Sequence, residues 1–448
     1  MTRSPARADE LGARPLGPLL WESCLHTTMS VGVYGVYALT NTWFVARMVG
    51  ETALAAVALA TPLLLLVGAV STTVGVGAAS LVARALGAGR RSDAARATGN
   101  AIVLFWSAAG ATTVLGLTFL DPLLRLLGAT AETMPYARPY AAVILAGALV
   151  STGFSAIVRA EGRIGFSTLL WVIPVALQIA LDPLLIMGLD MGVAGAALGT
   201  VGGQAVSALM SLWFFFAQPN RPYRITLAHL RPRLRTLGTM IAIGAPSFLA
   251  GIGATIVAAV VNASLATAGA AALAAFAVCA RVQTFVTMPQ TGITQGAQPV
   301  VSYSSGAGLA DRVGAATRIV MRSTVVYGAV ACAVVLLAAE PLVAVFLGPG
   351  PAHGDAATAL RIVALGFVFS GVAPLVSGLF QATGSPKASY AVSVGSVLLI
   401  RLPLVATFAT FGPNGIWVAL ALGELVSAIA ALGVMRRVRH ASRAMVVA

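Results

Sequence analysis

Long apolar stretches separated by short polar breaks make up most of this chain of 448 residues. Each stretch contains about 20 or more residues, which is enough for a helix to cross a hydrocarbon core of about 30 Å. The alternating pattern of the strands of a membrane barrel is absent from the sequence. The pattern therefore predicts twelve membrane-spanning helices, at residues 16–45, 54–86, 97–120, 136–160, 164–189, 193–216, 239–266, 271–304, 319–347, 356–382, 388–411 and 415–435.

Composition agrees with this pattern, since 58% of the residues are hydrophobic and only 9% are charged. Water-soluble domains of this size do not reach a mean hydropathy of +0.91, so we predict an integral protein of the lipid bilayer. The net charge of +14 comes mainly from polar breaks on one side of the predicted membrane, whereas the other side has Arg47, Arg125, Arg138 and Arg361. By the positive-inside rule we expect both termini in the cytoplasm, and this explanation of the charge needs no nucleic-acid partner.

The two halves of the chain repeat one plan. Residues 77–89 match residues 296–308, and Gly192 and Gly195 match Gly412 and Gly415, at a near-constant separation of about 220 residues. A duplication of six helices gives both halves the same orientation and a pseudo-twofold axis along the membrane normal, as in carriers that open alternately to each side. We predict a cytoplasmic N-terminal tail (1–15), an N-terminal lobe of helices 1–6 (16–216), a cytoplasmic linker (217–238), a C-terminal lobe of helices 7–12 (239–438) and a cytoplasmic C-terminal tail (439–448).

The charged residue most at odds with the apolar pattern is Asp182, within the fifth predicted helix. An unpaired carboxylate in hydrocarbon costs about 2.5–3.5 kcal/mol on insertion scales, so such a residue is expected to face a cavity or a partner. Pro183 follows directly and should kink the helix, which frees the carbonyl of Ile179 beside the carboxylate. This combination could bind a proton or a small cation. The alternative is that Asp182 only ends a helix near the membrane surface.

Three more polar residues are expected near Asp182. Asn41 and Thr200 lie at a similar predicted depth on helices 1 and 6, and Gln178 lies one turn from Asp182 on the same helical face. These residues could complete an ion site. Alternatively, they hold helices together through hydrogen bonds of about 0.6 kcal/mol each.

The C-terminal lobe has intramembrane charges of its own. Arg401 and Glu424 share a depth on adjacent antiparallel helices, so we predict that they pair, and Arg281 lies at a comparable depth and could join them. A salt bridge that neutralises charge is the favoured interpretation, whereas an unpaired Arg281 in the cavity would indicate an anionic or zwitterionic substrate. Further candidates for hydrogen bonds to a substrate, with helix packing as the alternative, are Gln283, Gln290, Gln295, Gln298, Tyr303 and Gln381.

Several motifs resemble those of the multidrug and toxic compound extrusion (MATE) transporters, and together they cover nearly the whole chain. The most specific are Leu181-Asp182-Pro183 and the stretch from Gln295 to Pro299. The other matching segments are residues 50–62, 159–162, 303–307, 381–387 and 415–417.

The resemblance implies a V-shaped pair of six-helix lobes that exports organic, often cationic, compounds in exchange for protons or sodium. In one prokaryotic branch, the ion site resembles an Asp on helix 1, an Asn and an Asp four residues apart on helix 5, and a Thr on helix 6. Asp182 and Thr200 match this pattern, whereas Asn41 and Gln178 replace the helix 1 Asp and the helix 5 Asn. With one carboxylate left, a proton carried by Asp182 is the simpler coupling device.

We therefore predict an antiporter of the cytoplasmic membrane that exports small organic, cationic and drug-like compounds by alternating access. The alternative is a flippase for lipid-linked oligosaccharides or lipids in the same superfamily. No nucleotide-binding motif or catalytic pair is found in the sequence, so the protein is not expected to be an enzyme. We expect no cofactor, with H⁺ or Na⁺ as the coupling ion, and we expect a monomer. The cysteines and histidines have no metal-binding spacing.

Overall fold

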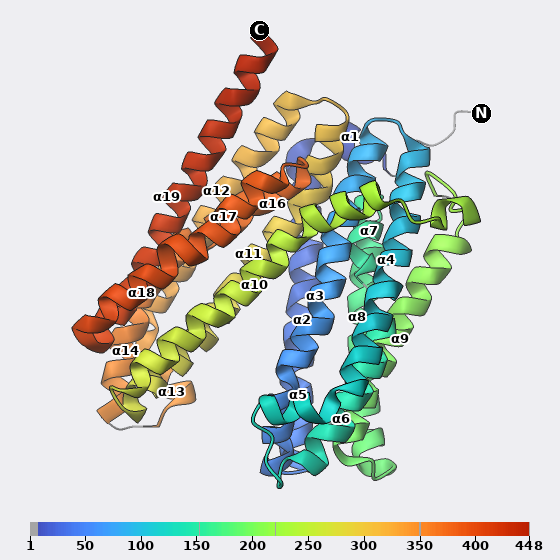
Figure 1. Cartoon of the computed structure of the whole chain (residues 1–448). Helices are drawn as coiled ribbons and strands as arrows, with labels where there is room; N and C mark the ends of the chain where they lie inside the picture. The colour runs from blue at the N-terminus through green and yellow to red at the C-terminus, as the bar shows by residue number, and fades with distance from the viewer. Residues whose placement is uncertain (1–7, 152, 220, 349–350, 448) are drawn as a thin grey trace. The chain divides into compact units, whose positions relative to one another are not determined.

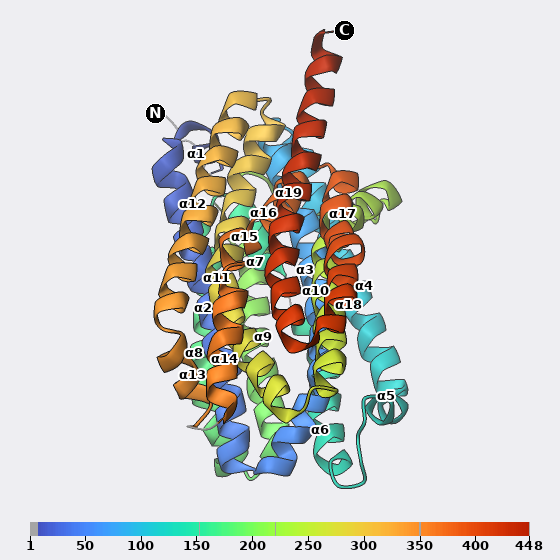
Figure 2. The same ribbon diagram turned by 90° about the vertical axis from the view of Figure 1, so that its left-hand side faces the viewer.

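The computed structural model describes residues 8–151, 153–219, 221–348 and 351–447, and within these ranges the chain is helical and has no strand (Figures 1 and 2). The first half contains α1 (Glu10–Ala13), α2 (Leu16–Met48), α3 (Glu51–Gly87), α4 (Arg91–Thr118), α5 (Leu120–Leu126), α6 (Met134–Ala146), α7 (Phe154–Ala160), α8 (Ile164–Pro183) and α9 (Gly192–Phe216). The second half contains α10 (Leu234–Ala266), α11 (Ala270–Gly306), α12 (Ala310–Leu337), α13 (Ala339–Phe346), α14 (Pro351–Ala364), α15 (Phe367–Ser370), α16 (Val372–Ala382), α17 (Pro386–Gly395), α18 (Leu402–Phe408) and α19 (Gly412–Val447). Shorter turns are η1 (Gly147–Val150), η2 (Leu184–Gly188), η3 (Leu227–Leu230), η4 (Ser396–Arg401) and η5 (Ala409–Phe411), of which η2 and η4 are π-helical.

The long helices account for the predicted spans. In the described part of the chain, nine helices are long and apolar enough to cross a membrane, or ten if the pair bent by 45° between Ala364 and Phe367 is one span. One of the nine, Pro386–His440, contains two predicted spans that meet at Gly412, where φ is 73°. The first predicted span corresponds to the continuous helix α2. The predicted all-helical fold of twelve membrane helices in two lobes is confirmed.

The described chain divides into two compact units. Unit 1 comprises Met1–Arg14, Met29–Gly244 and Ser302–Gly308, and unit 2 comprises Pro15–Thr28, Ala245–Val301 and Leu309–Ala448. Three of the divisions fall inside α2, α10 and α11, and the other two fall between helices. The lobe limits expected from the sequence, 16–216 and 239–438, stay a prediction.

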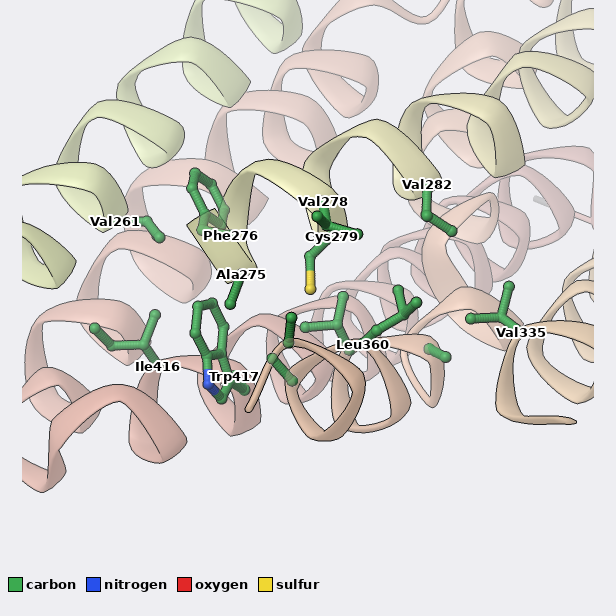
Figure 3. Packing of buried hydrophobic residues seen from close by; sticks show 14 of the residues in the cluster. Val261, Ala275, Phe276, Val278, Cys279, Val282, Val335, Leu360, Ile416 and Trp417 are labelled. Carbon is green, nitrogen blue, oxygen red and sulfur yellow. The ribbon is translucent and has the colours of Figure 1, made fainter. Parts of the chain in front are cut away.

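Each unit has its own apolar core. In unit 1, Tyr140, Leu124 and Leu145 belong to a cluster that is closed to solvent. In unit 2, Phe276 and Trp417 stack with their centroids 6.5 Å apart, and Cys279 and Leu360 lie in the same cluster (Figure 3). These cores fix the helices that carry the polar residues described below.

The fifth span changes its winding at the proline. α8 ends at Pro183 and continues as the π-turn η2, because proline donates no backbone hydrogen bond and clashes with the preceding turn. The chain then reverses at Asp190 and Gly192, which have φ values of 52° and 53°. Asp and Gly tolerate this left-handed conformation better than other residues. α9 returns along α8 and places its first turns beside the end of that helix.

The C-terminal helix differs from the expectation. The apolar pattern predicts an end at residue 435, but α19 continues to Val447. The extra residues are mainly Ala, Arg, Met and Val, and the first three are good helix formers. Helical propensity therefore extends the helix beyond the point where hydropathy ends the membrane span.

Candidate functional site

Asp182 lies in the last turn of α8 with a completely buried side chain. It faces α9 where that helix has Gly199, and a Cβ atom at this position would overlap Asp182 Oδ1. Oδ1 has no hydrogen-bond partner among the described residues. The glycine therefore leaves room for the carboxylate between two closely packed helices.

Three of the four predicted ion-site residues are joined by hydrogen bonds. Gln178 Nε2 donates to Asp182 Oδ2 and to Thr200 Oγ1, both at 3.4 Å. The Thr200 hydroxyl also donates to the carbonyl of Ala196, at 3.1 Å. Donor–acceptor distances of 3.4 Å are longer than the usual range of about 2.7–3.2 Å, so the carboxylate is only weakly compensated.

Asn41, the fourth predicted residue, lies on α2 and is 6% exposed. Its amide is near enough to Asp182 to interact with the carboxylate, but Asn41 Nδ2 makes no hydrogen bond in the described part of the chain. All four residues belong to unit 1. α2, α8 and α9 thus enclose one carboxylate, two amides and one hydroxyl.

Three tyrosines lie beside these residues and were not predicted from the sequence. Tyr37 donates to Thr200 Oγ1 at 3.4 Å, and Tyr34 lies next to it, with ring centroids 5.4 Å apart. Tyr140, on α6, is 1% exposed and interacts electrostatically with Tyr37 and Asp182. Tyr37 precedes Asn41 by one helical turn, and that spacing was the available signal in the sequence.

The predicted substrate contacts divide into two groups. Gln290, Gln298 and Gln381 have partners within unit 2: Ser370 donates to Gln290 Oε1 at 2.9 Å, and Gln381 Nε2 donates to Ser247 Oγ at 2.8 Å. Gln298 Nε2 donates to Gln381 Oε1 at 3.3 Å. These three side chains join helices of unit 2.

The remaining two glutamines are different. Gln283 and Gln295 are partly exposed on α11, and their side chains have no hydrogen bond within the described ranges. Tyr303 lies elsewhere, in unit 1, where its hydroxyl donates to Asp9 Oδ1 at 3.4 Å and its ring packs on Gly12. A role for Gln283 and Gln295 in substrate binding stays a prediction.

Two of the three intramembrane charges predicted in unit 2 form an ion pair, and the third lies apart from them. Arg401 Nη2 is 2.6 Å from Glu424 Oε2, and the two side chains are 23% and 9% exposed. Arg401 ends the π-turn η4, and the stem of Glu424 packs near Gly366 at the bend between α14 and α15. Arg281 does not share this contact, because its guanidinium lies over the ring of Phe346, 5.9 Å from the centroid. Its roles in substrate binding or in charge neutralisation stay predictions.

A second buried ion pair, also missed from the sequence, holds the segment between the two halves of the chain. Arg221 Nη2 lies 2.5 Å from Glu161 Oε1, and the side chains are 1% and 0% exposed. Tyr223 donates to the same carboxylate and shares a hydrogen bond of 2.5 Å with Thr98. Burial, together with Glu161, raises the pKa of Tyr223 well above its usual value, so this hydroxyl keeps its proton.

These features define a class of protein: a polytopic helical membrane protein with a buried carboxylate enclosed by three helices of one unit. A family model described as MatE matches residues 27–184 and 246–407, so the chain belongs to the MatE family. The resemblance deduced from the motifs is thereby confirmed.

Similar proteins agree with this assignment. The "Multidrug export protein MepA" of Staphylococcus haemolyticus (strain JCSC1435) is 26% identical over 415 residues, which are 90% of this chain and 90% of the relative. The protein of the same name from Staphylococcus aureus (strain MRSA252) is 25% identical over 401 residues, 89% of this chain and 88% of the relative.

Solved structures share the fold. The structure described as "Crystal structure of MATE in the bent conformation" has a TM-score of 0.92 at 24% identity and covers 99% of both chains. A "MOP superfamily transporter from Pyrococcus furiosus" with a reverse-polarity binding pocket has a TM-score of 0.90 at 24% identity and covers 97% of this chain and 98% of that chain.

Proposed function

We propose that this protein is a secondary antiporter that exports small organic cations and takes up protons through Asp182. The relatives described as multidrug export proteins support the export of small molecules. The multi-pass helices would lie in the cytoplasmic membrane, with both termini in the cytoplasm, and the protein would act as a monomer. The comparisons give no support to the flippase alternative.

The observation that carries the proposal is the incomplete compensation of the Asp182 carboxylate. Its side chain is 0% exposed, and Oδ1 has no hydrogen-bond partner among the described residues. A buried negative charge in this state is unfavourable, and a proton or a cation that binds there relieves the cost. Protons and cationic substrates that depend on the same charge would exclude each other, which is the requirement for exchange.

The chemistry of the neighbours favours a proton as the coupling ion. Gln178 presents its Nε2 to the carboxylate, and Asn41 Nδ2 has no other partner. Amide nitrogens donate hydrogen bonds, whereas hard cations prefer a shell of oxygen ligands. Because Thr200 Oγ1 already accepts hydrogen bonds from Gln178 Nε2 and Tyr37, this group of residues is better suited to holding a carboxyl group than to surrounding sodium.

The test compares two substitutions of aspartate in the same segment. Asp182→Asn removes the charge but keeps the size of the side chain. Asp190→Asn is the matched control, because Asp190 is exposed in the turn and Asn also tolerates its φ of 52°. Efflux of a cationic dye is measured in cells with equal membrane levels of wild type and the two variants.

Each outcome bears on a separate step of the proposal. We expect Asp182→Asn to abolish efflux and Asp190→Asn to preserve it, and collapse of the proton gradient alone to stop the wild type. Normal efflux by Asp182→Asn would remove Asp182 from coupling. Loss of efflux only after collapse of the sodium gradient would leave the transporter in place but reject the proton.

A further inference from the structure

The end of α19 carries a group of arginines that the transport proposal does not use. α19 has 36 residues, which at about 1.5 Å per residue gives about 54 Å against a hydrocarbon core of about 30 Å. Figures 1 and 2 both show its last turns extending beyond the ends of α12 and α17 of the same unit. The helix therefore leaves the bilayer while still ordered.

The first turns beyond the predicted span are exposed and basic. Arg436, Arg437, Arg439 and His440 are exposed, and no acidic residue follows Glu424 in the sequence. Met435 is buried and Val438 is half-buried. The helix thus has an apolar face toward the protein and cationic side chains on the rest of its surface.

These arginines differ from those basic residues of unit 1 on the same predicted side that have a carboxylate beside them. There the carboxylates of Glu10, Asp93 and Glu161 each form ion pairs with nearby arginines. In unit 2, Glu340 and Glu424 pair with His353, Arg361 and Arg401, and not with Arg436, Arg437 or Arg439. The positive charge at the end of α19 has no acidic partner within the described protein.

Position along the helix places this charge at the level of the lipid headgroups. Arg436 lies 24 residues after Gly412, so it is about 36 Å along the helix from the turn at the opposite membrane surface. Arginine has a planar fork of donors that matches phosphate oxygens, and juxtamembrane clusters of Lys and Arg attract anionic lipids. The charge, the depth and the exposure of these arginines all favour anionic lipids as the binding partner.

We propose that residues 436–439 of α19 form a binding site for the phosphate groups of anionic phospholipids. Arg436 and Arg439 lie about one turn apart on one face, and Arg437 covers the adjacent face. A purely topological role under the positive-inside rule requires positive charge during insertion but no selectivity among lipids in the folded protein. Selectivity for an anionic headgroup is therefore the property that separates the two explanations.

The experiment uses the full chain purified in a neutral detergent. Dioctanoyl phosphatidylglycerol or dioctanoyl phosphatidylcholine is added, and bound lipids are counted by native mass spectrometry to obtain dissociation constants. The test variant is Arg436→Gln/Arg437→Gln/Arg439→Gln. One control keeps the charge with Lys at the three positions, and the other is Arg47→Gln/Arg125→Gln, two exposed arginines on the other predicted side.

We expect wild type to prefer the anionic lipid, and the triple Gln variant to lose up to about a hundredfold in affinity at low salt, since each basic residue contributes about fivefold. The Lys variant should keep most of the affinity, and the Arg47/Arg125 control should match wild type. Equal binding of both lipids by wild type, or an unchanged triple Gln variant, would overturn the proposal. Displacement of the lipid by inorganic phosphate beyond the effect of sodium chloride at equal ionic strength would also overturn it, by showing a site for free anions.

Discussion

Breaking the Arg401–Glu424 pair should destabilise the protein, and removing both charges should restore much of the loss. The closest atoms of the pair are 2.6 Å apart. With charge centres about 4 Å apart and an effective dielectric constant of about 20, their attraction is about 4 kcal/mol. Arg401→Met leaves Glu424 buried with its charge uncompensated, so we expect a loss of about 3–5 kcal/mol in the free energy of unfolding.

Side-chain length predicts an order among the variants. Because the long Arg401 side chain can move its guanidinium toward water and the shorter Glu424 side chain cannot do the same for its carboxylate, Glu424→Leu leaves the charge that is easier to solvate. Glu424→Leu should therefore cost less than Arg401→Met. The double variant should cost less than either single change, because apolar residues of similar volume often replace a buried pair without loss.

The assay is denaturant unfolding in detergent micelles for wild type, both single variants and the double variant, which gives the coupling energy of the pair. Additive losses with no coupling would refute the reasoning. Dye efflux by the double variant then separates two roles: normal efflux indicates a pair that only neutralises charge, whereas a stable double variant without efflux indicates a role in transport.

Two further predictions concern the other buried groups. Gly199→Ala should displace the Asp182 carboxylate, because the new Cβ would overlap Oδ1, and should reduce dye efflux about tenfold or more. The control Gly202→Ala lies one turn further along the helix, where the new Cβ meets only the flexible end of Leu181, and should retain efflux. Equal efflux by the two variants would contradict the packing argument. Arg221→Lys should lower the free energy of unfolding by about 2–4 kcal/mol, because lysine cannot contact both oxygens of Glu161. Arg224 is exposed, so the control Arg224→Lys should change the free energy of unfolding by less than about 0.5 kcal/mol. Similar unfolding midpoints for the two variants would contradict the stabilising role of the Arg221–Glu161 pair.

The membrane spans were predictable because hydropathy reports the solvent of each segment directly. What hydropathy does not report is the winding inside a span. The bend between Ala364 and Phe367 contains no proline, and the break at Ala338 divides one predicted span into α12 and α13. Pro341, in the first turn of α13, cannot donate to the carbonyl of Leu337 and accounts for the break at Ala338, whereas the bend between Ala364 and Phe367 depends on packing with neighbouring helices.

The candidate site was predictable to a similar degree. Asp182 and Gln178 are identifiable because they interrupt an apolar run at a spacing of one turn, and Asn41 and Thr200 by their depth. Tyr140 could not be found in this way, because its proximity to Asp182 depends on how α6 packs in unit 1. The partners of Gln290 and Gln381 likewise come from distant helices, so their bonds were not visible in the sequence.

The repeat explains why coupling is proposed in only one half of the chain. Pro183 and Pro403 are equivalent in the duplication, and each lies close to a π-turn and a charged residue. The π-turn η2 follows Asp182 and Pro183, and the π-turn η4 ends at Arg401, two residues before Pro403. In unit 1 this charge is Asp182, which has only amide and hydroxyl neighbours, whereas in unit 2 Arg401 has a full counter-charge in Glu424. A compensated pair gains little from binding a further ion, but a lone carboxylate gains much. Under the proposed function, the same backbone irregularity would support ion binding in unit 1 and charge neutralisation in unit 2, and the residues that face it would decide between the two.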